Sequence, residues 1–121
     1  MSKIYETKVT SVGPNAADFL SEGMIILFGE EAPEMLADFC YNIVRNEIVG
    51  GNIVAGGTLK IDNQEFVITA VGNVVEQNLV TLGHITVKFD GADNAELPGA
   101  LHVKATGDIT IGENSVIEIF A

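Results

Sequence analysis

The sequence is poor in positive charge, in cysteine and in long apolar runs. Its 121 residues include six lysines and arginines against seventeen aspartates and glutamates, which gives a formal net charge of −11. This shortage argues against binding to nucleic acid or to anionic membranes, because both require a positive face. The single cysteine, Cys40, can form neither an intrachain disulfide nor a cysteine-rich metal cluster. No run reaches the roughly 20 apolar residues of a membrane span, and residues 1–6 turn polar where a signal peptide would turn apolar. We therefore expect a cytoplasmic protein that does not insert into the membrane.

The apolar residues make up 47% of the chain, enough for one domain over residues 1–121 with a buried core. Many recur at every second position, which predicts half-buried strands. Asn15 and Asn73 are expected to cap helices, and Asn63 and Gln64 to form a hairpin turn. Short strands with brief helices predict a mainly β barrel or sandwich of antiparallel strands. The expected strands are 4–11, 24–28, 39–44, 58–62, 65–71, 84–90, 100–106 and 116–120, and the expected helices are 15–21, 33–38 and 74–82.

Only two histidines, His84 and His102, are available for chemistry near neutral pH, and each lies on the polar face of a predicted strand. Lys88 and Lys104 lie on the same faces, because side chains at even spacing share a face of a strand. Nearby ammonium groups would lower the pKa of a histidine, keep one ring nitrogen free as a nucleophile and offset the charge of a phosphoryl group. The plain alternative is that both histidines are solvated or hydrogen-bonded.

Other reactive motifs are missing. The spacings HxH, CxxC and HExxH do not occur, so we expect neither a metal nor a cofactor. The acidic segment 90–96 lacks the register of an EF-hand and is expected to be a solvated loop. Neither the nucleophile elbow GxSxG nor a phosphate-binding GxxxxGK[ST] or GxGxxG loop is present. Cys40 lies in an apolar segment and is expected to be buried and inert.

A pattern of short motifs runs through the chain. Its most specific part is TAVGNVVEQNL at 69–79, followed by LGHITVKFDG at 82–91. The other parts are IYET at 4–7, EAP at 31–33 with FC at 39–40, and PG at 98–99 before LHV at 101–103. Together they resemble the glucitol/sorbitol-specific enzyme IIA component of the bacterial sugar phosphotransferase system, over essentially the whole chain. The resemblance implies a small closed barrel, so the expected fold is a small closed antiparallel β-barrel with short α-helices.

The resemblance also implies a phosphoryl relay. In this family a histidine accepts a phosphoryl group from the histidine-containing phosphocarrier protein and passes it to the sorbitol-specific IIB component. IIB phosphorylates the hexitol as the membrane IIC component imports it. Such a relay requires a nucleophile, positioning and neutralisation of charge.

The chain departs from the family pattern directly after the cysteine. Family members carry a segment of the form Cys-aromatic-Ile-His-Cys-His, and its first histidine is the usual candidate for phosphorylation. Here the segment is CYNIVR at 40–45, so Ile43 and Arg45 stand at the histidine positions. We therefore expect His84 to be the phosphoryl acceptor, because it matches the family's Gly-His motif, with His102 as the second candidate.

Two residues are expected to stabilise the phosphoryl group. Lys88 follows His84 on the same predicted strand, and Arg45 is suited to bidentate contact with phosphate. The plain alternative for Arg45 is a solvated charge at the end of a strand. Because the chain is so acidic, its few cations are expected to cluster around the acceptor.

Other functions stay open at this point. A divergent barrel that has lost the relay histidine would be a non-catalytic regulatory or ligand-binding protein. The β content also suits a carrier domain of the lipoyl or biotinyl kind, but no lysine stands in the Met-Lys-Met or Asp-Lys turn that such domains use. A homodimer is a further alternative: apolar residues such as Ile53 and Val54 could line its interface, or they could simply pack beneath the loop that carries them.

Overall fold

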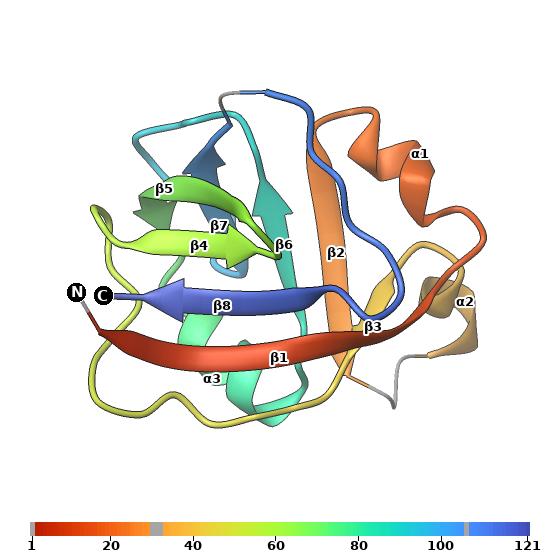
Figure 1. Ribbon diagram of the computed structural model, residues 1–121, viewed down its shortest axis with the longest axis horizontal. Helices are drawn as coiled ribbons and strands as arrows, with labels where there is room; N and C mark the ends of the chain where they lie inside the picture. The colour runs from red at the N-terminus through yellow and green to blue at the C-terminus, as the bar shows by residue number, and fades with distance from the viewer. Residues whose placement is uncertain (1, 30–32, 106) are drawn as a thin grey trace.

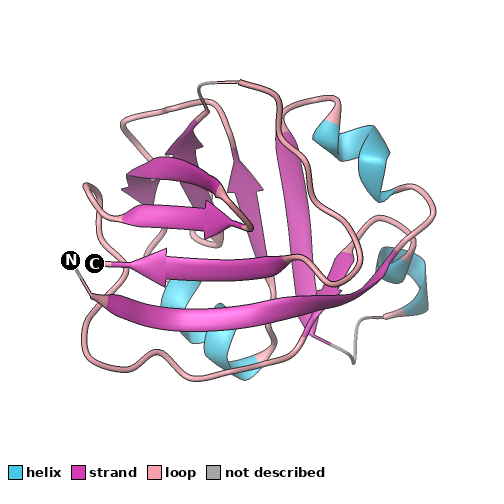
Figure 2. Cartoon of the chain, in the orientation of Figure 1, coloured by secondary structure: helices cyan, strands magenta, loops and turns pink. Residues whose placement is uncertain are grey.

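The computed structural model describes residues 2–29, 33–105 and 107–121, which form a β-barrel with short helices at its sides (Figure 1). Figure 2 shows how strongly strands dominate the chain. Glu31 and Ala32 of the EAP motif, and Thr106 at the end of a predicted strand, lie outside the described residues. The strands are β1 (Lys3–Val12), β2 (Met24–Gly29), β3 (Tyr41–Ile43), β4 (Thr58–Ile61), β5 (Gln64–Val71), β6 (Ile85–Lys88), β7 (Ala100–Lys104) and β8 (Val116–Phe120), and the helices are α1 (Ala16–Leu20), α2 (Glu34–Ala37) and α3 (Val75–Thr81).

The strands close into a barrel in the order β1-β3-β2-β6-β7-β5-β4-β8, and β8 pairs back onto β1. The predicted closed barrel is therefore confirmed. Most neighbours are antiparallel as predicted, but β2 and β3 run parallel, and so do β6 and β7. Parallel neighbours need a crossover, which α2 supplies for the first pair and residues 89–99 for the second (Figure 1). The second crossover brings the first residues of β6 and β7 to the same end of the barrel.

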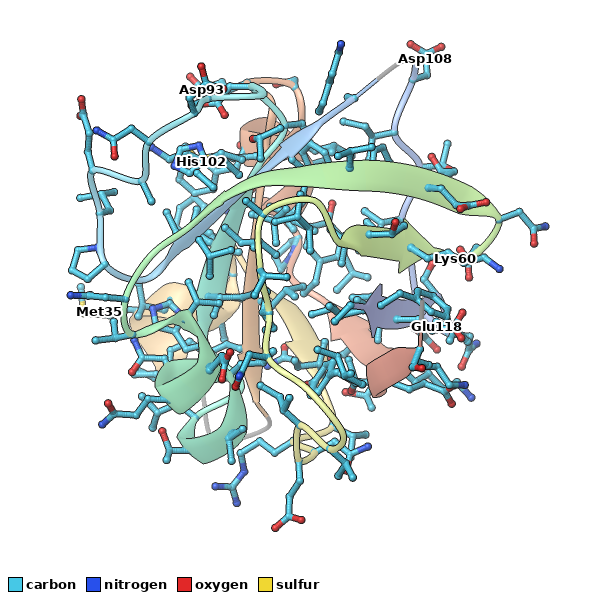
Figure 3. All side chains as sticks on the ribbon, turned by 90° about the vertical axis from the view of Figure 1, so that its left-hand side faces the viewer. Met35, Lys60, Asp93, His102, Asp108 and Glu118 are labelled. Carbon is cyan, nitrogen blue, oxygen red and sulfur yellow. The ribbon has the colours of Figure 1, made fainter. Side chains whose placement is uncertain are left out.

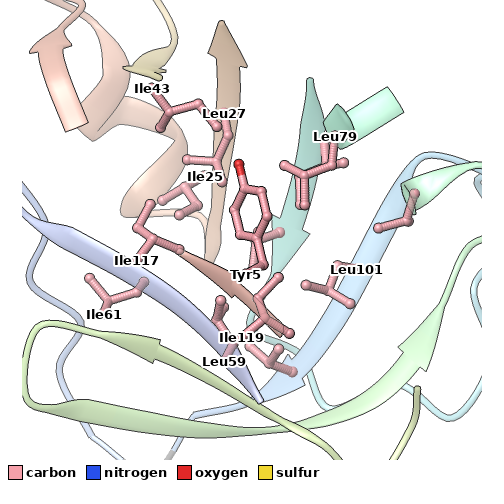
Figure 4. Packing of buried hydrophobic residues seen from close by; sticks show 14 of the residues in the cluster. Tyr5, Ile25, Leu27, Ile43, Leu59, Ile61, Leu79, Leu101, Ile117 and Ile119 are labelled. Atoms are coloured by element: carbon pink, nitrogen blue, oxygen red, sulfur yellow. The ribbon is translucent and has the colours of Figure 1, made fainter. Parts of the chain in front are cut away.

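The barrel is filled by alternate side chains of its strands. Tyr5, Ile25, Leu101 and Ile119 converge from four strands and are almost completely buried (Figure 4). Burial raises the pKa of Tyr5 to about 12, so the phenol stays neutral and packs as an aromatic ring. Full burial of a large apolar side chain contributes about 1.5–3 kcal/mol. The site described below is therefore supported by a well-packed scaffold.

The strands β4 and β5 form the predicted hairpin. The pairing of Ile61 with Gln64 closes a two-residue turn at Asp62 and Asn63, one residue earlier than predicted. Asp62 has a φ of 54°, which is the left-handed conformation that tight hairpin turns require at this position.

The helix caps differ from the sequence prediction. Asn15 occupies the N-cap position of α1, but its side chain makes no capping hydrogen bond. The N-cap of α3 is Val74 and not Asn73, and the N–H of Val74 donates to the carbonyl oxygen of Pro98 (3.0 Å). A backbone hydrogen bond to a distant loop therefore holds the start of α3, where an asparagine side chain was expected to cap the helix. Among the described residues, no helix is both long and apolar enough to cross a membrane.

The long segment 44–57 between β3 and β4 runs past α3 (Figure 1). The N–H of Ile53 donates to the carboxylate of Glu76 on α3 (2.8 Å), and the Ile53 side chain joins the core. Of the two alternatives for these residues, Ile53 packs beneath the loop, whereas Val54 is exposed. A homodimer remains a prediction, and Ile53 cannot be part of its surface.

Candidate functional site

His84 lies between the end of α3 and the first residue of β6. Gly83, with a φ of 69°, ends the helix in the left-handed conformation, and its N–H donates to the carbonyl oxygen of Leu79 (3.0 Å). The N–H of His84 then donates to the carbonyl oxygen of Asn78 (3.2 Å). These bonds fix the backbone of His84. The residue lies one position before β6, although the predicted strand 84–90 included it.

The imidazole of His84 is held by two residues of β2. Its Nδ1 lies 3.2 Å from the carbonyl oxygen of Leu27, and the ring stacks on Phe28 with centroids 4.4 Å apart and an interplanar angle of 27°. A carbonyl oxygen can only accept a hydrogen bond, so Nδ1 carries the proton and Nε2 keeps the lone pair of the neutral ring. His84 is thus half-buried and oriented, and not a freely solvated side chain of a strand face.

A cavity of about 130 Å³ lies beside His84. Its polar lining consists of His84, Asn78 of α3 and Thr86 of β6. The remaining lining is Leu97, Gly99 and Ala100. No carboxylate of the described residues lines it, so the cavity can receive an anion without direct repulsion.

Arg45, in the segment that follows β3, lies beside the backbone that leads into His84 and is not among the residues that line this cavity. Its Nη1 donates to the carbonyl oxygen of Thr81 at the end of α3 (2.8 Å), where a cation also offsets the negative end of the helix dipole. The arginine stem passes close to Gly29 and Gly83, where its Cγ lies 2.9 Å and 3.2 Å from the positions that a Cβ would occupy. The structure therefore places Arg45 next to the residue that precedes His84.

The lysines do not gather around His84. Lys88 lies four residues along the chain, about 13 Å away if the backbone is extended. It is in register with His102 of β7. Lys104 is also near His102, two residues along the same strand, and Lys3 is held by carboxylates of β1 and β8. The expected cluster of cations is therefore not found around His84, so the charge argument counts against His84 as the acceptor. Of the cations named here, only Arg45 lies beside the His84 backbone.

His102 is buried, although it lies on the outward face of β7. The residue is only 5% exposed, and its Nδ1 lies 2.8 Å from Oδ1 of Asp90. The same carboxylate oxygen accepts a hydrogen bond from the N–H of Ala92 (3.1 Å). Figure 3 shows His102 beside the loop that carries Asp93. His102 therefore fastens this loop to the barrel and is less accessible to a phosphoryl donor than His84.

Replacement of Asp90 by asparagine should reveal this fastening as a pH-dependent loss of stability. Burial raises the pKa of Asp90, but the hydrogen bonds from His102 and Ala92 and the charge of His102 outweigh burial, so the pKa is lowered overall. A lowered carboxyl pKa contributes stability above the ordinary value of about 3.9 and loses it as pH falls through the folded value. Because the Asp90 side chain is half exposed, solvent screens the contact, and urea unfolding should show Asp90→Asn to be less stable by about 0.5–1 kcal/mol at pH 5. The difference should shrink as the pH falls below about 4 and disappear once the carboxyl is protonated in both the folded and the unfolded state.

A double-mutant comparison isolates the contact with His102. In a His102→Leu background, Asp90→Asn should have much less effect at pH 5, because the main partner of the carboxylate is gone. An undiminished effect in that background, or a difference that persists once the carboxyl is protonated in both states, would show that the His102 contact does not stabilise the loop.

Ile43 and Cys40, in the segment where family members carry histidines, are both buried. Ile43 is 0% exposed and lies between β1 and β2, in register with Val9 and Gly29. A side chain at position 43 therefore points into the barrel. The Sγ of Cys40 donates to the carbonyl oxygen of Leu36 (2.9 Å), and burial raises the pKa of the thiol, in agreement with the expected inert cysteine.

A larger open cavity, of about 470 Å³, lies between segments 69–73 and 93–98. Asp93 and Glu96 line it, so its charge is unfavourable for a phosphoryl group. Over the described ranges, no group of three or more histidine, cysteine, aspartate or glutamate side chains is placed to hold a metal ion. The smaller cavity at His84 is thus the better match for phosphoryl chemistry.

Four residues around His84 were not predicted: Leu27, Phe28, Asn78 and Thr86. The first two approach because β2 pairs with β6, with Leu27 opposite Ile85. A period of two does not reveal which strands pair or in which register. Thr86 could have been found, since even spacing puts it on the same face as His84.

Comparison with known proteins identifies the family. The sequence model of the family described as "PTS system glucitol/sorbitol-specific IIA component" matches residues 4–118. The chain is 38% identical over 118 residues to the "PTS system glucitol/sorbitol-specific EIIA component" of Shigella flexneri, and equally to that of Escherichia coli (strain K12), covering 98% of this chain and 95% of each relative. The crystal structure of a PTS system IIA component from Enterococcus faecalis V583 is also similar, with a TM-score of 0.82 and 28% identity over 97% of this chain and 100% of that chain. The resemblance seen in the motifs is confirmed, and the chain belongs to the glucitol/sorbitol-specific IIA components of the phosphotransferase system.

Proposed function

We propose that the chain is a phosphoryl carrier and that Nε2 of His84 is the acceptor. One observation carries the choice of residue: the carbonyl oxygen of Leu27 holds Nδ1 of His84, while Phe28 stacks on the ring. This arrangement leaves Nε2 as the nucleophilic nitrogen of a ring that lines a cavity to which the described residues contribute no carboxylate. Membership of the family supports the activity class, and the geometry supports the residue.

The transfer requires no cofactor. The lone pair of His84 Nε2 attacks the phosphorus of a phosphohistidine on the donor protein, and a new N–P bond forms as the donor N–P bond breaks. The released electron pair returns to the donor imidazole. The phosphorylated His84 ring becomes cationic, and its Nδ1–H still donates to the Leu27 carbonyl oxygen, which stabilises that charge. Transfer to the next protein reverses these steps.

Arg45 is proposed to supply the positive charge nearest the acceptor. One of its five N–H groups is bonded to the Thr81 carbonyl oxygen, which leaves others for a phosphoryl oxygen. Lys88 has no part in this proposal, because it lies far along β6 and beside His102 in register.

The proposed partners are the histidine-containing phosphocarrier protein as donor and the sorbitol-specific IIB component as recipient, in the cytoplasm. The net charge of −11 supports docking to a basic patch on a partner. Attraction of this kind accelerates encounters and weakens as salt is added, which suits a transient relay. The hexitol itself would be bound by the membrane component.

Phosphorylation with purified proteins tests the proposal. The chain is incubated with phosphoenolpyruvate, enzyme I and the phosphocarrier protein, and the phosphoryl group is located by mass spectrometry at neutral or alkaline pH. We expect an acid-labile group on His84. His84→Ala should abolish the label, whereas His102→Ala should retain it.

The possible results separate the alternatives. A label that survives in His84→Ala and disappears in His102→Ala would transfer the acceptor role to the buried histidine. An unlabelled wild-type chain, with a phosphorylated relative as positive control, would support the non-catalytic regulatory or ligand-binding barrel instead.

A further inference from the structure

The cavity beside His84 has the size and polarity of a phosphoryl-binding pocket. Its volume is about 130 Å³, whereas one water molecule takes about 30 Å³ of the liquid. A phosphoryl group of one phosphorus and three oxygens is compatible with that space. Because the lysines lie elsewhere, neutral hydrogen-bond donors must hold most of its oxygens.

Asn78 is the first such donor. Its main-chain oxygen accepts hydrogen bonds from the N–H groups of Leu82 and His84 (2.9 Å and 3.2 Å), so its position relative to the histidine is fixed. Its side-chain Nδ2 lies toward the opposite wall, 3.6 Å from where a Cβ on Gly99 would be. Within the described part of the chain, this amide has no hydrogen-bonded partner and remains available to a ligand.

Thr86 is the second donor. Its N–H bonds to the carbonyl oxygen of Gly99 (3.1 Å), which fixes the strand against the same wall of the cavity. Its side chain lies two residues after His84 and on the same face of the chain. The hydroxyl makes no side-chain hydrogen bond to any residue that the structure describes.

We infer that Asn78 Nδ2 and Thr86 Oγ1 donate hydrogen bonds to the oxygens of the phosphoryl group on His84 Nε2, an inference that rests on the proposed function. The two donors come from the helix before His84 and the strand after it, so they approach the group from different elements. Being neutral, they orient the phosphoryl group without binding it as strongly as a cluster of lysines would. Weak retention suits a carrier that must release the group to a second protein.

Chemical phosphorylation tests the two donors without any partner protein. Potassium phosphoramidate transfers its phosphoryl group to histidine nitrogen and releases ammonia, and phosphorylation of His84 in the full chain can be followed by intact mass and ³¹P NMR. We expect Thr86→Val, which keeps the shape but removes the hydroxyl, to slow labelling about tenfold or more. Thr86→Ser restores the hydroxyl and should stay within about twofold of the wild type. Asn78→Asp keeps the shape but adds a like charge, and should lower the rate further than Asn78→Ala.

Thermal unfolding of each variant checks that the fold is intact. Equal labelling rates in wild type, Thr86→Val and Asn78→Ala would overturn the inference. So would equal rates in Thr86→Val and Thr86→Ser, since the hydroxyl would then be irrelevant. Labelling of His84 by phosphoramidate but not by the phosphocarrier protein would refute the proposed relay. The labelling rates of the Thr86 and Asn78 variants would still test the two hydrogen-bond donors. No labelling of His84 by either reagent would refute both.

Discussion

Alanine at Gly83 is expected to lower the free energy of unfolding by about 3 kcal/mol and to slow phosphorylation of His84. A side chain at a φ of 69° is strained, which costs about 1–2 kcal/mol. The new Cβ would also lie 2.8 Å from the backbone nitrogen of Gly29 and 3.0 Å from its Cα. Gly29 cannot simply move, because its N–H donates to the carbonyl oxygen of Leu82 (2.9 Å). Moving the Gly29 backbone away from the new Cβ would lower the free energy of unfolding by about a further 1–3 kcal/mol.

Gly23 provides a matched control for the contact. Its φ is 85°, also left-handed, but a Cβ there would meet nothing within 4 Å. Gly23→Ala should therefore show the conformational cost alone, about 1–2 kcal/mol, and leave labelling of His84 unchanged. Urea unfolding and the phosphorylation assay measure both effects. Equal losses of stability at the two positions would mean that the contact between Gly83 and Gly29 relaxes freely.

The close approach of Gly29 and Gly83 explains how the site is assembled. It brings β2 against the end of α3, and this is what places Leu27 and Phe28 at the imidazole of His84. Arg45 fills the space next to both glycines. The orientation of the proposed nucleophile, His84, therefore depends on Gly29 and Gly83, two positions that have no side chain.

Local features of the site could be predicted, whereas its long-range contacts could not. His84 follows from a motif, and the end of α3 at a glycine follows from the preference of helix ends for the left-handed conformation. The carbonyl oxygen of Leu27 was invisible because it depends on strand register. Lys88 was placed near His84 because the two share a predicted face, but the rise of a strand separates residues four apart by about 13 Å. His102 was expected on the polar face of its strand, but its burial could not be predicted, because the pattern of one strand does not reveal that Asp90 and its loop cover it.

The same distinction applies to the fold. Alternation of apolar residues was sufficient to predict the strands and a barrel or sandwich, whereas closure of the barrel was expected only from the family resemblance. The two parallel pairs were missed, because strand direction depends on how the connections cross the barrel ends. The parallel pairing of β6 and β7 puts Thr86 opposite Ala100 and so forms the cavity at His84.

A histidine introduced at position 43 is expected to destabilise the fold without creating a phosphoryl acceptor. Ile43 is 0% exposed within the core, so Ile43→His removes a buried aliphatic side chain and buries an imidazole without a designed partner. We expect the free energy of unfolding to fall by about 3–5 kcal/mol in a urea titration. Arg45→His is the matched control, since it introduces the same side chain at an exposed position and removes one hydrogen bond to Thr81. Its effect should be about 1 kcal/mol.

Whether a new histidine at position 43 or 45 can accept a phosphoryl group is tested in a chain that lacks the proposed acceptor, His84. In a His84→Ala background, neither Ile43→His nor Arg45→His should restore labelling by the phosphocarrier protein. At position 43 the reason is access, because the side chain points into the barrel between β1 and β2. At position 45 the reason is reach, because a histidine is shorter than the arginine whose Nη1 bonds to the Thr81 carbonyl oxygen, so that oxygen would no longer orient the ring. Phosphorylation of the new histidine at position 43 would show that this strand opens to partners, and His84 would then lose its claim as the site on which the relay depends.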